Sequence, residues 1–222
     1  MLRRGTWATR IGLVAAIVAG APASAGAEPA RGGGQVEAFA GGSFCIDGRV
    51  GCSRTSLPVT GGMEPSFGGG LGLGVRPRPW ILIAALYRAG RFDPDYADVG
   101  REVYDAVVQH TIAVAVRPIL PVWRFDLGLG LGVGYSRQAA DYREPGRRDF
   151  TQGVTLVSGI TADAFVTDHV FAGVGVDVLI NLHGAVCRRT YIASDCGRAS
   201  GRVALTPNHQ VLFGLRIGTT FG

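Results

Sequence analysis

Six charged residues stand among apolar and glycine residues in segments that are otherwise poor in charge. A charge that leaves water must be paired or hydrated. We therefore expect these side chains to form an internal network in which guanidinium groups donate hydrogen bonds to carboxylates. Such a network can fill the interior of a protein, or it can line a narrow path for ions or protons. The six residues are Glu37, Arg124, Asp126, Asp163, Asp177 and Arg216.

The four histidines are the candidates for general-base chemistry. His110 is predicted on the apolar face of its segment beside Thr111, and no serine lies two residues away on that face. Ser158 belongs to a different segment, and Asp163 is predicted on the opposite face. The roles of nucleophile, base and orienting acid cannot all be filled, so we expect no catalytic residue. The histidines are His110, His169, His183 and His209.

The stretch 123–135, WRFDLGLGLGVGY, shows which element positions such charges. Its odd positions are apolar or aromatic, and its even positions are charged or glycine. A period of two predicts an extended strand, because successive side chains point to opposite faces. An apolar face with an aromatic ring at each end, opposite a polar face, is typical of a strand that crosses a lipid bilayer. A soluble ligand-binding barrel would have the reverse facing, with its apolar side chains in the lumen.

Eight strand-like segments of this kind follow one another along the chain. Segment 80–90 is apolar on both faces, so its facing stays open, and segment 103–117 is predicted to direct Ala106 outward and Asp105 inward. The segments are 35–44, 64–76, 80–90, 103–117, 123–135, 150–165, 170–182 and 209–221.

The connections between these segments alternate in length. Short turns rich in proline or Asx residues are predicted at 76–79, 117–121 and 166–169. Longer polar loops are predicted at 45–63, 91–102, 137–149 and 183–208. Short turns at one end and long loops at the other indicate a bacterial outer-membrane barrel with periplasmic turns and extracellular loops. An even number of strands places both mature termini at the periplasmic end.

The N-terminal segment has the layout of a secretory signal peptide. Three arginines precede an apolar run over about 11–21, and small-residue cleavage sites follow, the last ending at Ala27. The apolar run is shorter than the ~20 residues that a membrane-spanning helix needs. We expect a cleavable signal peptide over 1–27, with an N-terminal anchor as the alternative, and a single barrel domain over 28–222.

The cysteines fall in two close pairs, both in predicted outer loops. In an exported protein an even number of cysteines indicates disulfides. Local bridges Cys45–Cys52 and Cys187–Cys196 are favoured. Bridges across the two loops stay open, since the first and last strands of a closed barrel are neighbours. A structural zinc site is disfavoured because the paired close spacing of zinc ligands is missing, and we expect no metal.

Composition excludes further classes of protein. Glycine accounts for 35 of 222 residues and alternates with apolar residues, without the triplet period of collagen. The chain has a net charge of +5 and no lysine, and removal of the three arginines of residues 1–27 lowers that charge to about +2. No clustered basic stripe is present, so we do not expect a nucleic acid as partner.

Taken together, the chain resembles the small eight-stranded outer-membrane barrels, namely OmpA-like membrane domains and their OmpX-type relatives. The resemblance covers nearly all of the chain after residue 27 and includes its C-terminus, LFGLRIGTTFG. In that family the last strand carries an alternating apolar signal for the barrel-assembly machinery, and this chain departs from it by placing Gly222 after the terminal aromatic residue. The matching residues are Phe213, Leu215, Ile217 and Phe221.

The resemblance implies an envelope protein with a structural or surface-interaction role, acting through its loops as a monomer without cofactor. Outer-membrane lipid, lipopolysaccharide and an extracellular ligand are the expected partners. The arginines of loop 137–149 could contact lipopolysaccharide phosphates, and the acidic residues of loop 91–102 could attract a cation. A small pore is the first alternative function, and a lipid-modifying enzyme is the second. These loop residues are Asp93, Asp95, Asp98, Glu102, Arg143, Arg147 and Arg148.

Overall fold

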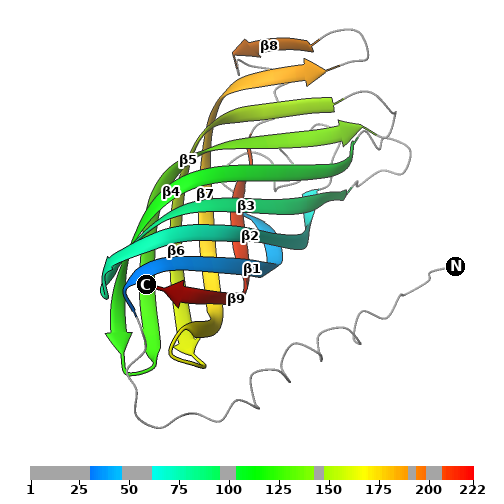
Figure 1. Ribbon diagram of the computed structural model, residues 1–222. Coiled ribbons are helices and arrows are strands. Elements are labelled where there is room, and N and C mark those ends of the chain that lie inside the picture. Colours follow the sequence, from blue (N-terminus) through cyan, green and yellow to red (C-terminus); the bar gives the residue numbers. More distant parts are fainter. Residues whose placement is uncertain (1–30, 47–61, 96–103, 143–147, 190–193, 199–206) are drawn as a thin grey trace, which may run out of the picture.

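The computed structural model describes residues 31–46, 62–95, 104–142, 148–189, 194–198 and 207–222, and within them the chain forms a closed antiparallel barrel of eight long strands (Figure 1). Strands β1 to β7 are neighbours in chain order, and β9 closes the ring between β7 and β1. The predicted all-β barrel is confirmed. The long strands are β1 (Gly33–Ile46), β2 (Gly62–Arg78), β3 (Ile81–Asp95), β4 (Tyr104–Val122), β5 (Phe125–Tyr142), β6 (Arg148–Phe165), β7 (Val170–Arg189) and β9 (His209–Phe221).

The strands continue beyond their predicted ends on the side of the long loops. Strand β5 reaches Tyr142 and β7 reaches Arg189, where the sequence analysis expected loops. A short strand, β8 (Ser194–Arg198), pairs with the end of β7 outside the ring. Hydrophobic alternation stops where apolar surroundings stop, whereas main-chain hydrogen bonds between neighbouring strands continue past that point. The strands are therefore longer than the apolar pattern that reveals them. The predicted signal peptide lies outside the described residues.

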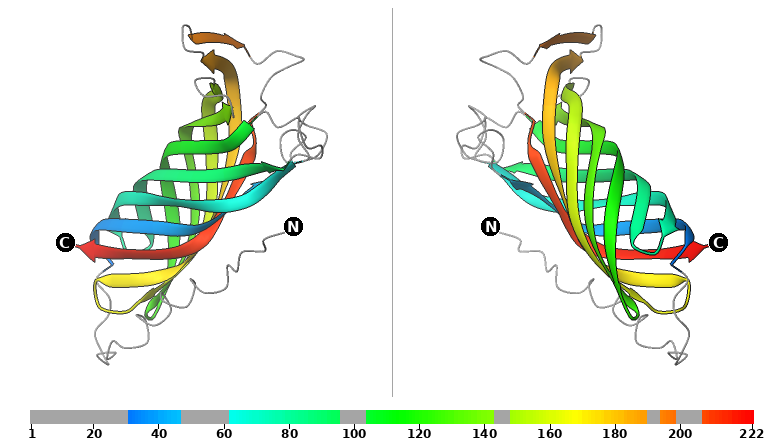
Figure 2. Two further views of the ribbon diagram at one scale, coloured as in Figure 1. Left: turned by 90° about the vertical axis from the view of Figure 1, so that its right-hand side faces the viewer. Right: turned by 90° about the vertical axis from the view of Figure 1, so that its left-hand side faces the viewer.

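Short turns gather at the opposite end, which we call the short-turn end (Figure 2). Only Pro79 and Trp80 separate β2 from β3, and only Trp123 and Arg124 separate β4 from β5. The prediction of a turn at 117–121 was wrong, because Pro118 lies within β4 and faces outward. The chain reverses instead at Trp123, whose φ of 52° is the positive value that a two-residue hairpin turn requires at its first position.

Inward and outward faces follow the predicted alternation over most of the barrel. Leu129 and Leu131 of β5 are 50% and 59% exposed, whereas Asp126 on the same strand is 4% exposed. The open question about segment 80–90 is settled by Leu82 and Leu86, which face the interior together with Ala115 and Ile119. One facing was wrong at the start of β4, where Asp105 is exposed and Ala106 is buried. A pairing irregularity between Tyr104 and Ala106 shifts the alternation there.

The exposed apolar residues form a band around the outside of the barrel. On β5 the band runs from Phe125 to Tyr135, which are 49% and 52% exposed. Ten residues of strand span roughly 33 Å, and a tilt of about 40° reduces this to roughly 25 Å along the barrel axis, the height of the apolar band of outer-membrane barrels. Within the described residues no helix has the length and hydropathy to cross a membrane.

Leu129 lies midway along this band, so an arginine there would meet the bilayer midplane. We expect Leu129→Arg to lower the free energy of unfolding by ~2–4 kcal/mol. The matched variant Val122→Arg places the same charge at the short-turn edge and should cost only ~0–1 kcal/mol. Urea titration of the protein refolded in lipid vesicles measures both values. Equal losses at the two positions would contradict the prediction that the apolar band faces the hydrocarbon of a bilayer.

Candidate functional site

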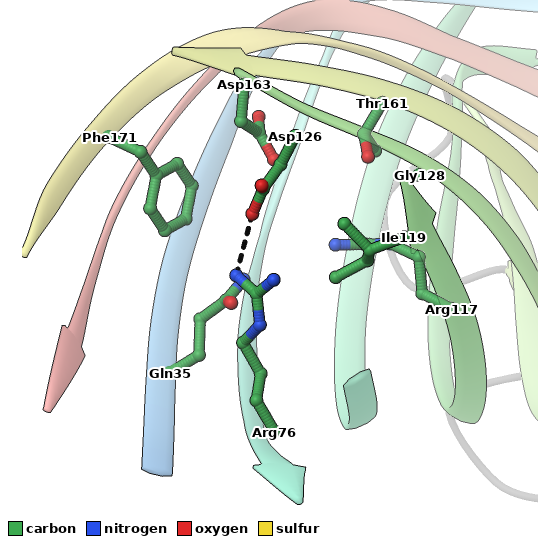
Figure 3. A pocket seen from close by; sticks show the side chains of 9 residues that line it. All are labelled: Gln35, Arg76, Arg117, Ile119, Asp126, Gly128, Thr161, Asp163 and Phe171. Atoms are coloured by element: carbon green, nitrogen blue, oxygen red, sulfur yellow. Dashed lines mark hydrogen bonds and ion pairs between the residues drawn. The ribbon is translucent and has the colours of Figure 1, made fainter. Parts of the chain in front are cut away.

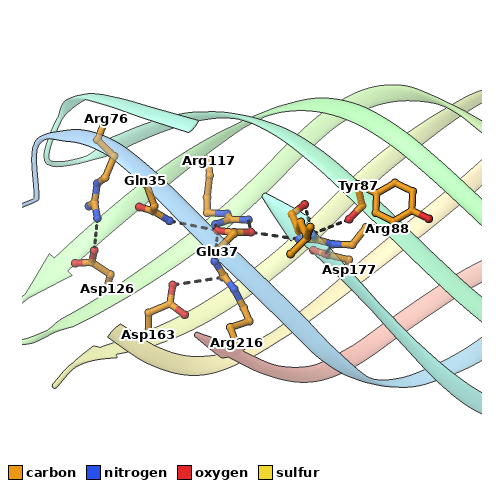
Figure 4. A network of polar contacts seen from close by, with 11 residues as sticks. Gln35, Glu37, Arg76, Tyr87, Arg88, Arg117, Asp126, Asp163, Asp177 and Arg216 are labelled. Carbon is orange, nitrogen blue, oxygen red and sulfur yellow. Dashed lines mark hydrogen bonds and ion pairs between the residues drawn. The ribbon is translucent and has the colours of Figure 1, made fainter. Parts of the chain in front are cut away.

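Glu37, on the inward face of β1, is the centre of an ion-pair network inside the barrel (Figure 4). Its Oε2 accepts hydrogen bonds from Arg216 Nη2 at 2.6 Å and Arg117 Nη1 at 3.0 Å. Its Oε1 accepts from Arg88 Nη2 at 3.3 Å. The Glu37 side chain is 2% exposed, so this single carboxylate holds three guanidinium groups out of water.

Two further carboxylates complete the central cluster. Arg88 Nε donates to Asp177 Oδ2 at 2.7 Å, and Arg216 Nη1 lies 3.4 Å from Asp163 Oδ2. Three carboxylates therefore face three arginines, and the cluster is balanced in charge. Burying ions is costly unless each has an opposite partner and hydrogen bonds. The arrangement supplies a partner for every charge in this layer.

Asp126 forms a second cluster nearer the short-turn end. Its Oδ2 accepts from Arg76 Nη1 at 2.8 Å and its Oδ1 accepts from Arg31 Nε at 2.9 Å. Arg31 also donates to the main-chain oxygen of Trp123 and so fastens the chain just before β1 to the β4–β5 turn. The charges of this layer bind the N-terminal edge of the barrel to the opposite wall.

The structure places five of the six predicted charges in these two clusters and one outside them. Arg124 lies in the β4–β5 turn, and its Nη2 is 3.4 Å from Asp168 Oδ1 in the β6–β7 turn. The expectation that Arg124 belongs to a strand was wrong, because the chain reverses at Trp123 and Arg124 and not at 117–121. Four arginines of the clusters escaped the sequence analysis. Arg88 lay in segment 80–90, whose inward face could not be assigned. Arg76 and Arg117 lay in predicted turns, and Arg31 precedes the first predicted strand.

Glycines make the space that these long side chains occupy. A Cβ added at Gly72 would come within 2.6 Å of Glu37 Cγ, and one at Gly128 within 2.7 Å of Arg117 Cδ. A Cβ at Gly175 would come within 2.8 Å of Arg216 Cδ. At distances below about 3.0 Å one of the two groups must shift, so a side chain at any of the three positions would displace a member of the network. The glycines that alternate with apolar residues therefore leave room for the long charged side chains of facing strands to approach the backbone.

Little open space remains between the two charged layers. A cavity of about 10 Å³, enough for about one water molecule, lies among Arg76, Arg117, Asp126 and Asp163 (Figure 3). Phe171 and Ile119 cover its sides. In an eight-stranded barrel side chains are expected to fill the interior. In this part of the barrel, charged groups that bind one another occupy the lumen beside Ile119 and Phe171.

Uncharged polar side chains fill the interior toward the long loops. His183 contacts Ser136 Oγ at 2.6 Å through Nε2 and Thr151 Oγ1 at 2.8 Å through Nδ1. Ser136 is also hydrogen-bonded to Thr155 and to Asn181 Oδ1. His183 lies beyond 170–182, the segment that hydrophobic alternation predicts as a strand, so the sequence pattern does not reveal this serine–histidine contact. The partner of the second imidazole nitrogen is a hydroxyl rather than a carboxylate, so the pair lacks the acid that orients a catalytic histidine.

The predicted disulfides and loop sites have different outcomes. Cys187 and Cys196 form the predicted bridge, which joins β7 to β8. Cys45 is also disulfide-bonded, and its expected partner Cys52 lies outside the described residues. Among the described residues no group of three His, Cys, Asp or Glu is placed to hold a metal ion. Asp95 lies in β3; Asp98, Glu102, Arg143 and Arg147 lie outside the described residues.

The remaining loop candidates already have partners within the barrel wall. Asp93 Oδ1 accepts from Arg91 Nε at 2.7 Å, and Arg148 is paired with Asp141 across the β5–β6 hairpin. The predicted assembly-signal residues lie on the exposed face of β9, where they are 51–58% exposed; they are Phe213, Leu215, Ile217 and Phe221.

Removal of the central carboxylate would leave three buried guanidinium groups without their shared partner. We expect Glu37→Gln to lower the free energy of unfolding by ~3–5 kcal/mol. Asp93→Asn removes an acid from an ion pair whose side chains are about 40% exposed and should cost ~1 kcal/mol or less. Urea titration in lipid vesicles distinguishes the two cases. A Glu37→Gln barrel as stable as the wild type would show that the network does not hold the interior together.

Two lumen-facing glycines provide a test of the space argument. A methyl group at Gly72 would strike Glu37, whereas one at Gly130 would meet no atom closer than 3.7 Å. We expect Gly72→Ala to cost ~1–3 kcal/mol through overpacking. Gly130→Ala should be neutral or slightly stabilising, because alanine has less backbone freedom in the unfolded chain. The same unfolding titration measures both, and the account fails if Gly130→Ala is the more damaging change.

Proteins of known structure share this architecture. The sequence matches no protein-family model and no curated protein. The structure is similar to the crystal structure of Neisserial surface protein A, with a TM-score of 0.56 and 14% identity over 85% of this chain and 97% of that chain. It is also similar to the outer membrane protein OprG from Pseudomonas aeruginosa, with a TM-score of 0.55 and 10% identity over 86% of this chain and 98% of that chain. The chain therefore has the fold of these proteins, a small closed barrel of eight antiparallel strands.

Proposed function

We propose that this protein is a sealed barrel of the Gram-negative outer membrane with a structural or surface-interaction role and no catalytic activity. The observation that carries the proposal is the interior. Buried ion pairs surround Glu37 and Asp126, and the space between them holds about one water molecule. A lumen closed in this way stabilises the fold and does not conduct solutes. Any interaction with other molecules would then take place on the outer surface and the loops of the barrel.

The outer face supports the location in a membrane. Large apolar side chains such as Ile112, Leu129 and Ile160 are 50–67% exposed, and a patch of this extent in water would promote association. The length of the band fits the outer membrane, and at the short-turn end two residues suffice to join β2 to β3 and β4 to β5. We infer that the protein is a monomer whose outer surface contacts outer-membrane lipid and lipopolysaccharide. We also infer that the barrel-assembly machinery recognises β9 and that the long loops bind an extracellular ligand.

A small pore is the second candidate, and the distribution of charge favours it over an enzyme. Charged side chains follow one another along the interior from Asp126 to Asp177. Arg216 Nη1 contacts Asp163 only as an ion pair at 3.4 Å, and Asp163 Oδ1 has no hydrogen-bond partner among the described residues, so this pair is held less tightly than those around Glu37. A channel through the barrel would require the pairs around Glu37 to separate.

Conductance in planar bilayers tests the proposal. The wild-type barrel should give no steady conductance, because the paired side chains around Glu37 and Asp126 fill its lumen. The double variant Glu37→Ala with Arg117→Ala removes one opposite pair, preserves net charge and enlarges the cavity, so stepwise conductance should appear. Asp93→Asn, outside the lumen, is the matched control and should behave as the wild type. Stable unitary conductance of the wild type would contradict the sealed barrel and support the pore.

A further inference from the structure

A row of polar side chains crosses the outer surface of the barrel where the apolar band ends. His110 of β4 lies opposite Arg137 of β5, and Arg137 lies opposite Gln152 of β6. The row lies one outward-facing position beyond Tyr135, on the side away from the short turns. Side chains directly opposite each other on one face of a sheet are about 5 Å apart. The row therefore brings an arginine and a histidine together at the edge of the membrane.

Arg137 differs from the arginines of the internal network in its partners. Arg88, Arg117 and Arg216 each bind a carboxylate, whereas Arg137 contacts none within the described ranges. Its guanidinium carbon lies 3.8 Å from the centre of the Phe150 ring, and its buried Nε has no hydrogen-bond partner among the described residues. Stacking on a ring uses the face of the guanidinium and leaves its in-plane N–H groups for an anion. Arg137 thus presents an oriented positive charge that no carboxylate of the described ranges neutralises.

His110 is held beside this charge by Tyr87 of β3. The Tyr87 hydroxyl and His110 Nδ1 are 2.7 Å apart, and the two rings are stacked with their centres separated by 6.1 Å. When the hydroxyl donates to Nδ1, the imidazole proton is on Nε2, the nitrogen on the opposite side of the ring. His110 then offers a second N–H donor in the row that contains Arg137. Tyr87 therefore orients the Nε2–H group of His110 so that it can donate a hydrogen bond to an anion.

We propose that Arg137 and His110, with Tyr87 as a positioning residue, bind a phosphate group of lipid A in the outer leaflet. The row is at the height of lipid headgroups, and planar arginine N–H groups suit phosphate oxygens. Exposed apolar residues lie directly beneath it, among them Ile112 at 67% and Tyr135 at 52%, so acyl chains of the same molecule would cover them. A free anion would gain nothing from that apolar surface. The site rests on the proposed outer-membrane orientation and adds a specific lipid contact to it.

Native mass spectrometry of the barrel refolded in detergent and titrated with diphosphoryl lipid A tests the site. We expect Arg137→Gln to weaken lipid A binding by about tenfold, the effect of losing a charge-assisted hydrogen bond. His110→Gln and Tyr87→Phe should each weaken it less, and Arg137→Lys should recover part of the loss because it restores the charge without the stacking plane. Arg78→Gln is the matched control, since Arg78 is an exposed arginine at the short-turn end, and it should bind as the wild type does.

The outcomes separate the site from the proposed function. Equal weakening by Arg137→Gln and Arg78→Gln, or equal wild-type affinity for dephosphorylated lipid A, would overturn the site and leave the barrel proposal intact. Preference for phosphatidylglycerol over lipid A would also overturn it. A gel shift between unboiled and boiled samples verifies that each variant is folded. The absence of that shift in the wild type would instead count against the barrel.

Discussion

The structure depends on one constraint: the charged groups inside a barrel this narrow must neutralise one another, because packed side chains leave little room for water around them. A bilayer-facing sheet has to close so that no edge is left without hydrogen bonds, and eight strands close into a cylinder with room only for side chains. Glu37 is where the requirement is strongest. It meets Arg88, Arg117 and Arg216 from three other strands and so connects walls that are distant in sequence.

The glycine content and the arginine content of the chain have a common explanation in this constraint. Long arginine side chains can reach across the lumen only if facing positions carry no side chain. Gly72 beside Glu37 and Gly128 beside Arg117 provide that space. The outward neighbours of the same glycines, such as Leu71 and Leu127, stay apolar for the lipid. The repeated alternation of glycine and leucine therefore has two causes. Glycine faces the crowded lumen on one side of the strand, and leucine faces the outside of the barrel on the other.

The sequence predicted the barrel because alternation is a local property that each strand displays by itself. The inward charges on clearly alternating strands, such as Asp126 and Asp177, could be named in the same way. The partners of those charges could not. Arg88 lies in a strand that is apolar on both faces, since Leu82 and Leu86 pack inside while Ile83 faces lipid. Proline at 118 suggested a turn, and only pairing with β3 and β5 shows that β4 continues through it.

The central claim is that hydrocarbon surrounds the odd-numbered face of β5, and nitroxide accessibility along that face tests it most directly. Spin labels attached to single cysteines at positions 125, 127, 129, 131, 133 and 135 of the barrel in vesicles would be exposed to oxygen and to a water-soluble nickel complex. The account predicts that oxygen accessibility is highest at position 129 and falls toward both ends, with nickel accessibility following the opposite course. Nickel access at position 129 equal to that at the ends, or burial of that label from both reagents, would contradict it.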